Sequence, residues 1–350
     1  MRLSTLGVCL VAGSMSLAAQ PERTALPPMK SLEQLAPELN ARLMALERAQ
    51  GVLLGALIKG NGTVNEADVL RSMTRRASDL SSLTRPDVEA DRGFDALGAQ
   101  AAAIIREAHT FHREVLAIIG SLEPSQRKAA LAAAVHRYKG GRATLADAPK
   151  DMGILYDHQY TSFVAPQPPA TEPTRTLKYA SLTGFTWAAH WYELAAVEPL
   201  EISNDVAARE RALATIAGRF SRKLSAGAPL DGYPTELPLA PAIAPGLVAG
   251  SERAAAIIDN LNMMLSVIQD VLVHPAVRDR RAAVSAAVAQ FIDRPYRCVQ
   301  VDEWIVVALR HSIFDQGGYA LASMSGYERN AFGHGHHYGV KRPPPACDPE

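Results

Sequence analysis

The chain has 350 residues, of which 48% are hydrophobic and 21% are charged, a composition typical of a globular protein with a substantial core. Lysine plus arginine equals aspartate plus glutamate at 36 each, so the formal net charge is zero. Because phosphate binding requires a basic excess, this balance argues against nucleic acid as the main partner.

The first segment is typical of a secretory signal peptide, which we place at residues 1–19. Arg2 supplies the positive charge, an apolar run extends from Leu6 to Leu17, and small residues surround Ala18. The run is too short for a membrane span, and no later segment is long and apolar enough for one. The sequence therefore predicts a periplasmic or secreted protein with no transmembrane segment after signal removal.

Periodic apolar residues predict an N-terminal helical bundle over residues 31–164. The expected helices cover residues 31–59, 65–83, 94–122 and 124–139. Their short connections favour antiparallel neighbours. The helix over 94–122 has the most regular apolar seam, which predicts coiled-coil-like packing. The seam consists of Leu97, Ala101, Ile104, Ala108, Phe111, Val115, Ile118 and Leu122.

A Pro-rich segment over residues 165–178 predicts an extended linker between two units. The alternative is a long crossover within a single domain. Beyond it we expect a second helical unit over residues 179–330. Its expected helices cover residues 181–197, 204–224, 251–273, 275–292 and 302–314, the last of them with a partly buried strand as the alternative.

The helix over 251–273 has a wide apolar stripe, which predicts a helix buried between neighbours. A Pro- and Gly-rich excursion over 227–250 precedes it and could be a lid, a binding loop or a wrap. An irregular Gly/His-rich tail over 331–350 ends the chain. The predicted fold class is therefore all-α, with two bundles of antiparallel helices joined by a Pro-rich crossover.

The tail contains the strongest candidate for metal chemistry. His334, His336 and His337 lie among glycines, which would let their side chains converge. Imidazole favours zinc, copper or nickel. The sequence thus predicts a divalent transition-metal site here, with a glycine-rich loop whose histidines bind nothing as the alternative.

A second candidate lies at His190 and Glu193, which are three residues apart and therefore share one face of a helix. Such a pair could bind the metal ion or relay a proton. The alternative is a His–Glu pair at a helix contact, beside two tryptophans. The spacing resembles the Gly-x-His-x-x-Glu motif of imelysin-like exported helical proteins, with Ala188 in place of the family's glycine, over six residues.

The helix over 94–122 also carries His109 and His112. His112 lies in line with Ile105 and Ile119 and so borders the apolar seam, where we expect a buried-edge histidine satisfied by one hydrogen bond. No Glu-x-x-His sequence occurs, so the signature of di-iron bundles is missing.

Cys298 and Cys347 are the two cysteines that remain after signal removal. An oxidising compartment favours a disulfide between them, with two free thiols as the alternative. No Cys-x-x-Cys-His, Walker A loop or Gly-x-Ser-x-Gly turn occurs, so we expect no haem c and no nucleotide.

These patterns favour a non-enzymatic function, namely an exported binding or accessory protein that binds a transition-metal ion through its tail histidines. The alternative is a structural subunit of a periplasmic complex that binds a protein partner and has no ligand of its own. A third hypothesis is a metal-dependent hydrolase or redox enzyme that uses His190, Glu193 and His311.

Overall fold

The computed structural model describes residues 29–81, 86–154, 179–202, 205–225, 237–274, 277–292 and 294–315, without the side chains of 310–315. Helices and loops make up these ranges, which contain no strand and one isolated antiparallel bridge between Lys150 and Cys298. The prediction of an all-α fold is therefore confirmed. The signal peptide, the 165–178 linker and the 331–350 tail lie outside the described residues.

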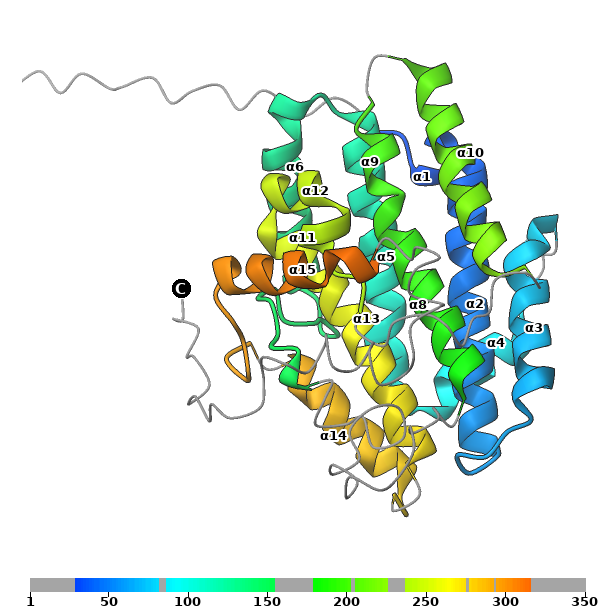
Figure 1. The fold of residues 1–350 in the computed structure, drawn as a ribbon. Coiled ribbons are helices and arrows are strands. Elements are labelled where there is room, and N and C mark those ends of the chain that lie inside the picture. The colour runs from blue at the N-terminus through cyan, green and yellow to red at the C-terminus, as the bar shows by residue number, and fades with distance from the viewer. Residues whose placement is uncertain are drawn as a thin grey trace, which may run out of the picture.

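The helices follow one another in two groups (Figure 1). The first group is α1 (Leu32–Leu35), α2 (Pro37–Lys59), α3 (Glu66–Ser78), α4 (Val88–Ala96), α5 (Ala99–Ser121) and α6 (Pro124–Lys139). The second group is α8 (Ala180–Ala195), α9 (Val197–Leu200), α10 (Val206–Lys223), α11 (Ala240–Ile243), α12 (Pro245–Gly250), α13 (Glu252–Val273), α14 (Arg280–Ile292) and α15 (Val301–Asp315). The last helix of the prediction is thus confirmed as a helix, and its strand alternative is wrong.

Two predicted helices are each interrupted once in the structure. The expected helix over 31–59 breaks at Ala36, because Pro37 lacks a backbone N–H and begins α2. The expected helix over 94–122 begins only at Ala99, because Gly98 takes a φ of +106° that L side chains rarely adopt. The prediction missed α4, which precedes this glycine.

The eight residues of the predicted seam are nevertheless all buried, at 4% exposed or less. Six of them lie within α5, while Leu97 follows α4 and Leu122 follows α5. Helix α13 also begins as expected, with the Ser251 side chain accepting a hydrogen bond from the Ala254 N–H. Helix α14 begins at Arg280 and not at Pro275. Asp279 provides the reason, because its side chain accepts a hydrogen bond from the Ala282 N–H at the start of the helix.

Helices α8 and α13 are antiparallel. The start of α8 lies at the loop after α2, where the Val64 N–H donates to Tyr179 Oη at 3.0 Å. The end of α13 lies at the same loop, because the Leu272 carbonyl oxygen is next to Gly62. Midway along, Thr186 Oγ1 of α8 donates to Gln269 Oε1 of α13 at 3.1 Å.

The second part of the Pro-rich excursion, residues 237–250, packs on the bundle as a wrap. Both carboxylate oxygens of Asp259 on α13 accept from the Ala240 N–H at the start of α11, each at 3.0 Å. Trp304 Nε1 of α15 donates to the same carboxylate at 3.1 Å. One buried aspartate therefore holds α11 and α15 against α13.

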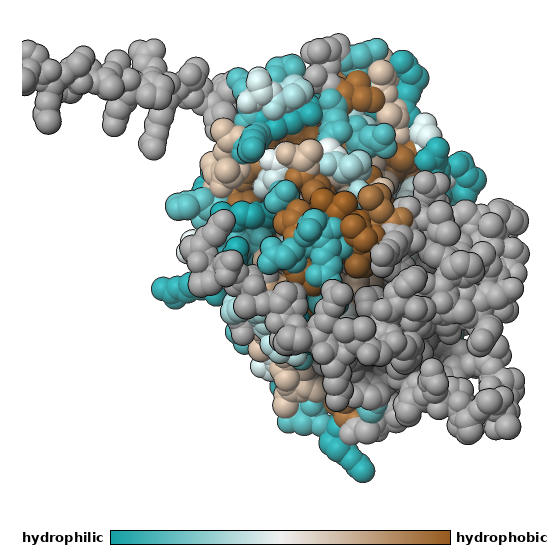
Figure 2. All heavy atoms as spheres, turned by 60° about the vertical axis from the view of Figure 1, so that its left-hand side comes forward, coloured by the Kyte–Doolittle hydropathy of each residue, from teal (hydrophilic) through white to brown (hydrophobic). Residues whose placement is uncertain are grey.

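The face of the molecule that lies on the left in Figure 1 carries α15, and Figure 2 turns it toward the viewer. Hydrophobic residues gather near the centre of this face among hydrophilic ones. On α15 itself, Val306 is 46% exposed and Leu309 is 54% exposed. Helix α15 therefore leaves two large apolar side chains in contact with solvent.

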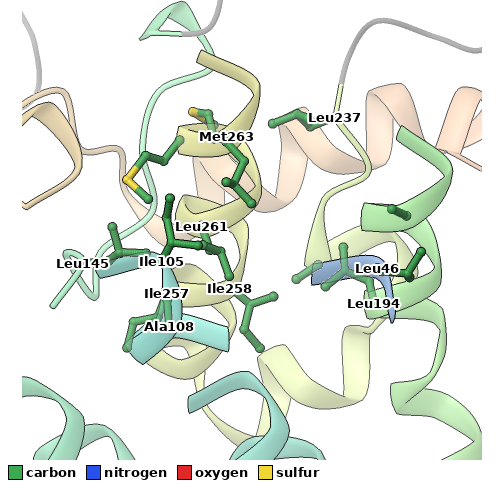
Figure 3. Packing of buried hydrophobic residues seen from close by; sticks show 14 of the residues in the cluster. Leu46, Ile105, Ala108, Leu145, Leu194, Leu237, Ile257, Ile258, Leu261 and Met263 are labelled. Carbon is green, nitrogen blue, oxygen red and sulfur yellow. The ribbon is translucent and has the colours of Figure 1, made fainter. Parts of the chain in front are cut away.

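The core is one hydrophobic cluster with contributions from both sides of the 165–178 segment. Figure 3 shows Ile257 and Ile258 of α13 close to Ile105 and Ala108 of α5. Helix α13 contacts both α2 and α5. The division into two separate units stays a prediction.

Within the described ranges, α13 is the helix that is long and apolar enough to cross a membrane, and 94% of that window is buried inside the fold. The expectation that no segment after the signal peptide is long and apolar enough for a membrane span is therefore wrong for α13. Such burial is what a core helix shows, and it agrees with the prediction of a helix enclosed by neighbours.

Candidate functional site

Five ionisable side chains from three helices approach one another in the interior, and we call them the buried His/Glu cluster. Helix α2 supplies Glu47, α5 supplies His109 and His112, and α8 supplies His190 and Glu193. The three histidines and Glu193 are 4% exposed or less, and the Glu47 side chain is 18% exposed. The cluster is therefore enclosed by the bundle on nearly all sides.

Helical spacing explains why these residues point inward together. His109 and His112 are three residues apart on α5, and His190 and Glu193 are three apart on α8. Residues at this spacing lie on one face of a helix, one turn after the other. The two pairs face each other because both helices turn this side toward the core, where Ala108 and Ala189 are also buried.

Helix α5 connects the members of the cluster. His109 Nδ1 lies 3.8 Å from Glu47 Oε1 of α2. The other oxygen of Glu47 accepts a hydrogen bond from Arg113 Nη1 at 2.7 Å. One turn further on, His112 has a hydrogen bond to the backbone of Glu193. The three helices are thus held in register at the level of the cluster.

Most polar atoms of the cluster have no hydrogen-bond partner in the described part of the chain. The unpaired atoms are both ring nitrogens of His190, Nε2 of His112 and Oε2 of Glu193. The ring nitrogens of His109 also lack a hydrogen bond of good geometry, although this ring contacts the backbone of Ile105. Leaving such an atom buried and unpaired costs about 1–3 kcal/mol. Native proteins satisfy buried polar groups of this kind with ordered water, an ion or a ligand.

Helix α13 carries a further polar side chain at the same level. Thr186 of α8 contacts Gln269 of α13, and both Glu193 and Asn262 lie seven residues, or two turns, from that contact along their antiparallel helices. Asn262 is fully buried, and neither of its side-chain polar atoms has a partner among the described residues. The region of unpaired polar atoms therefore extends toward α13.

Burial sets the protonation states of the cluster. Desolvation lowers the pKa of His112 and of His190 to about 3, and the charge of a protonated His109 would lower both further. Desolvation also lowers the pKa of His109, although the carboxylate of Glu47 opposes this. At neutral pH all three imidazoles are therefore uncharged, and each keeps a nitrogen lone pair.

Glu193 is shifted in the opposite direction. Burial raises the pKa of this carboxyl group to about 8, and the negative charge of Glu47 adds to the effect. At neutral pH Glu193 is therefore mostly protonated and uncharged. A cation placed beside Glu193 would stabilise its carboxylate form. The carboxyl group would therefore release its proton when the cation binds.

The structure confirms that His190 and Glu193 share one helix face and shows that both are buried. The prediction for His112 is also right, because it has one hydrogen bond. Glu47 was not among the predicted site residues, because it lies within the leucine stripe of α2 directly after Leu46.

Donors of the right type are present, but they do not yet converge. Among the described residues, no three His, Cys, Asp or Glu side chains are arranged so that they could hold a metal ion as they stand. The tail histidines His334, His336 and His337 lie outside the described residues, as does Cys347. The predicted disulfide therefore stays a prediction. Cys298 itself is fully buried, next to Lys150.

No family model, curated protein or solved structure matches this chain.

Proposed function

We propose that this chain is an exported helical binding protein that holds one divalent transition-metal ion in the buried His/Glu cluster. The observation that supports this proposal is the set of unpaired imidazole nitrogens and the unpaired Glu193 oxygen in an enclosed core. The export part of the proposal rests on the predicted signal peptide. The tail histidines would then form a separate set of ligands.

The donor chemistry suits zinc, copper or nickel. Neutral imidazole is the commonest protein ligand of these metals, and a carboxylate completes many of their sites. His109, His112 and His190 would supply nitrogen, and Glu193 would supply oxygen after losing its proton. Because these donors do not converge as they stand, binding requires rotation of the side chains about their χ angles.

The neighbouring groups would position the ligands. Glu47 lies 3.8 Å from His109 Nδ1, and a carboxylate at a ring nitrogen fixes the orientation of the ring and the position of its proton. Arg113 in turn holds Glu47 by a hydrogen bond of 2.7 Å. This pair would leave the other nitrogen of His109 directed at the ion.

Binding is favoured over catalysis because the cluster is enclosed. His190 is 0% exposed and Glu193 is 1% exposed, so an organic substrate would have no access to either group. The enzyme hypothesis also needed His311, whose side chain lies outside the described residues.

The test is the metal content of the mature protein, purified from its native compartment without an affinity tag. Four preparations are compared: the native chain, the double variant His109→Gln/His190→Gln, the triple tail variant His334→Ala/His336→Ala/His337→Ala, and His136→Ala. His136 is an exposed histidine of α6 and serves as the matched control.

We expect about one equivalent of metal in the native chain, the tail variant and the control, and a loss of metal in the His109/His190 variant. Metal that is lost only from the tail variant would refute the buried site and move the ion to the tail. If no preparation contains metal, even after dialysis against zinc, the proposal is refuted. Ordered water would then be the partner of the unpaired atoms in the cluster.

A second candidate function, that of a partner-binding subunit, is supported by the exposed Val306 and Leu309 of α15. Exposed apolar side chains on one helix favour contact with another protein. In that case Val306→Asp/Leu309→Asp would abolish a chemical crosslink formed by the native chain in its own compartment. An unchanged crosslinking pattern would exclude α15 as the contact.

A further inference from the structure

A pocket of about 360 Å³ opens between the start of α2, the end of α8 and the middle of α10. Its walls are mainly apolar and include Leu35, Leu39, Leu213 and Ala217, with Tyr192 at its inner side. The volume lies at the lower end of the roughly 300–1,000 Å³ that is typical of small-molecule sites. The pocket is separate from the buried His/Glu cluster, although Tyr192 directly precedes Glu193.

One charged residue of the pocket is buried. Arg209 of α10 is 7% exposed, and its Nη1 donates to the carbonyl oxygen of Gly120 at 3.2 Å. Leu35 packs against Gly120, so the guanidinium group lies at the Leu35 end of the pocket. Among the described residues, no carboxylate is within ion-pair distance of Arg209.

A guanidinium group that is buried without a counter-ion is unfavourable, because its charge loses hydration and gains only a neutral acceptor. The two carboxylates of the pocket do not remedy this. Glu38 is 72% exposed at its side chain and pairs with Arg42, while Glu210 is exposed to solvent. The pocket thus combines apolar walls, a buried positive charge and an acidic outer rim.

We infer that this pocket binds a small amphiphile with one carboxylate or equivalent anionic group on an apolar body. The anionic group pairs with the Arg209 guanidinium, which forms bidentate contacts with carboxylates readily. The apolar body lies along Leu39, Leu213 and Ala217. This inference does not depend on the metal proposal, since it involves neither the histidines nor Glu193.

The test uses octanoate and 1-octanol, which share an apolar chain and differ in charge, in calorimetric titrations of the mature full-length chain. We expect octanoate to bind more tightly than octanol. Arg209→Gln should weaken octanoate binding roughly 10- to 100-fold, the range expected when a hydrogen bond to a charged group is removed. Arg209→Lys keeps the charge and should weaken it less.

Two further variants separate the site from a general effect on folding. Arg211→Gln removes an exposed arginine of the same helix and should leave octanoate binding unchanged. Ala217→Phe fills the pocket without touching Arg209, and it should abolish binding of both ligands while the thermal transition stays cooperative. These two variants still decide the matter if Arg209→Gln does not fold.

Three results would overturn the inference. Equal affinity for octanoate and octanol would show that the charge is not recognised. Unchanged octanoate binding by Ala217→Phe would place the ligand elsewhere. No binding of either ligand would overturn the inference as well, and a change in oligomeric state of Ala217→Phe would then show that protein occupies the groove.

Discussion

Replacing Glu193 by glutamine tests whether this buried carboxyl group is protonated in the folded protein. Glutamine has nearly the same shape as protonated glutamate and cannot ionise. The carboxyl pKa rises from its ordinary value of 4.5 to about 8 on folding. Between these pH values the folded chain keeps a proton that the unfolded chain releases, so the native glutamate lowers the free energy of unfolding as the pH rises.

The size of the effect follows from the two pKa values of Glu193. A shift of one pKa unit corresponds to about 1.4 kcal/mol, so ionisation should remove roughly 3 kcal/mol of stability between pH 5 and pH 8. The Glu193→Gln variant does not lose this stability, because glutamine cannot ionise. The free energy of unfolding of the variant, relative to the native chain, should therefore increase by roughly 3 kcal/mol over that interval.

The assay is urea unfolding of both proteins at several pH values, followed by tryptophan fluorescence in the presence of a chelator. Using the difference between the two proteins cancels the contribution of the histidines, which titrate in the same interval. Glu198→Gln, at an exposed position five residues further on, is the matched control and should show no such trend. A difference between Glu193→Gln and the native chain that does not depend on pH would refute the reasoning.

Three other substitutions have defined outcomes. Burial lowers the pKa of His190 to about 3. Below pH 6.5 this histidine is therefore protonated in the unfolded chain but stays neutral in the folded chain. The free energy of unfolding consequently decreases as the pH falls from 6.5 toward 3. His190→Gln should remove roughly 3 kcal/mol of this loss between pH 7 and pH 4, and parallel acid-denaturation curves of the two proteins would contradict the assignment. Gly98→Ala should destabilise the chain by roughly 1–3 kcal/mol, because the φ of +106° between α4 and α5 strains any side chain although space is open there. Gly218→Ala, within α10 and with only a flexible arginine nearby, should instead stabilise by about 0.5–1 kcal/mol, and thermal melts of both variants that shifted in the same direction would refute this account.

The helices that were predicted correctly are those whose apolar period and end signals agree. Helix α6 has Pro124 at its start and Gly140 after its end, and α13 has Ser251 as its N-cap and a stripe that is buried throughout. Such local signals act within a few residues, so a sequence contains them directly.

The missed elements depend on tertiary contacts. Helix α4 has a weak apolar pattern of its own, but Gly93 approaches Gly51 and Gly55 of α2 so closely that a Cβ atom would clash with their backbones. Helix α11 is four residues long, and its start is held by Asp259, which lies nineteen residues later in the chain. Nothing within either segment indicates these partners.

Only part of the candidate site could be predicted from the sequence. The spacing of His190 and Glu193, and the position of His112 beside the seam, indicated inward-facing polar groups. That α5 and α8 place these groups at one level, next to Glu47 of α2, follows from the register of three helices. Register depends on packing across the whole bundle, which a single sequence does not contain.

The central claim, a metal ion held by the buried His/Glu cluster, is tested most directly by counting the protons released when zinc binds to the metal-free chain. The count comes from calorimetric titrations at pH 7 in two buffers of different ionisation enthalpy. Because Glu193 is mostly protonated at this pH and the histidines are neutral, the native chain should release about one proton per zinc ion, and Glu193→Gln should release none. Equal proton release by the two proteins, or no zinc binding by the native chain, would contradict the account.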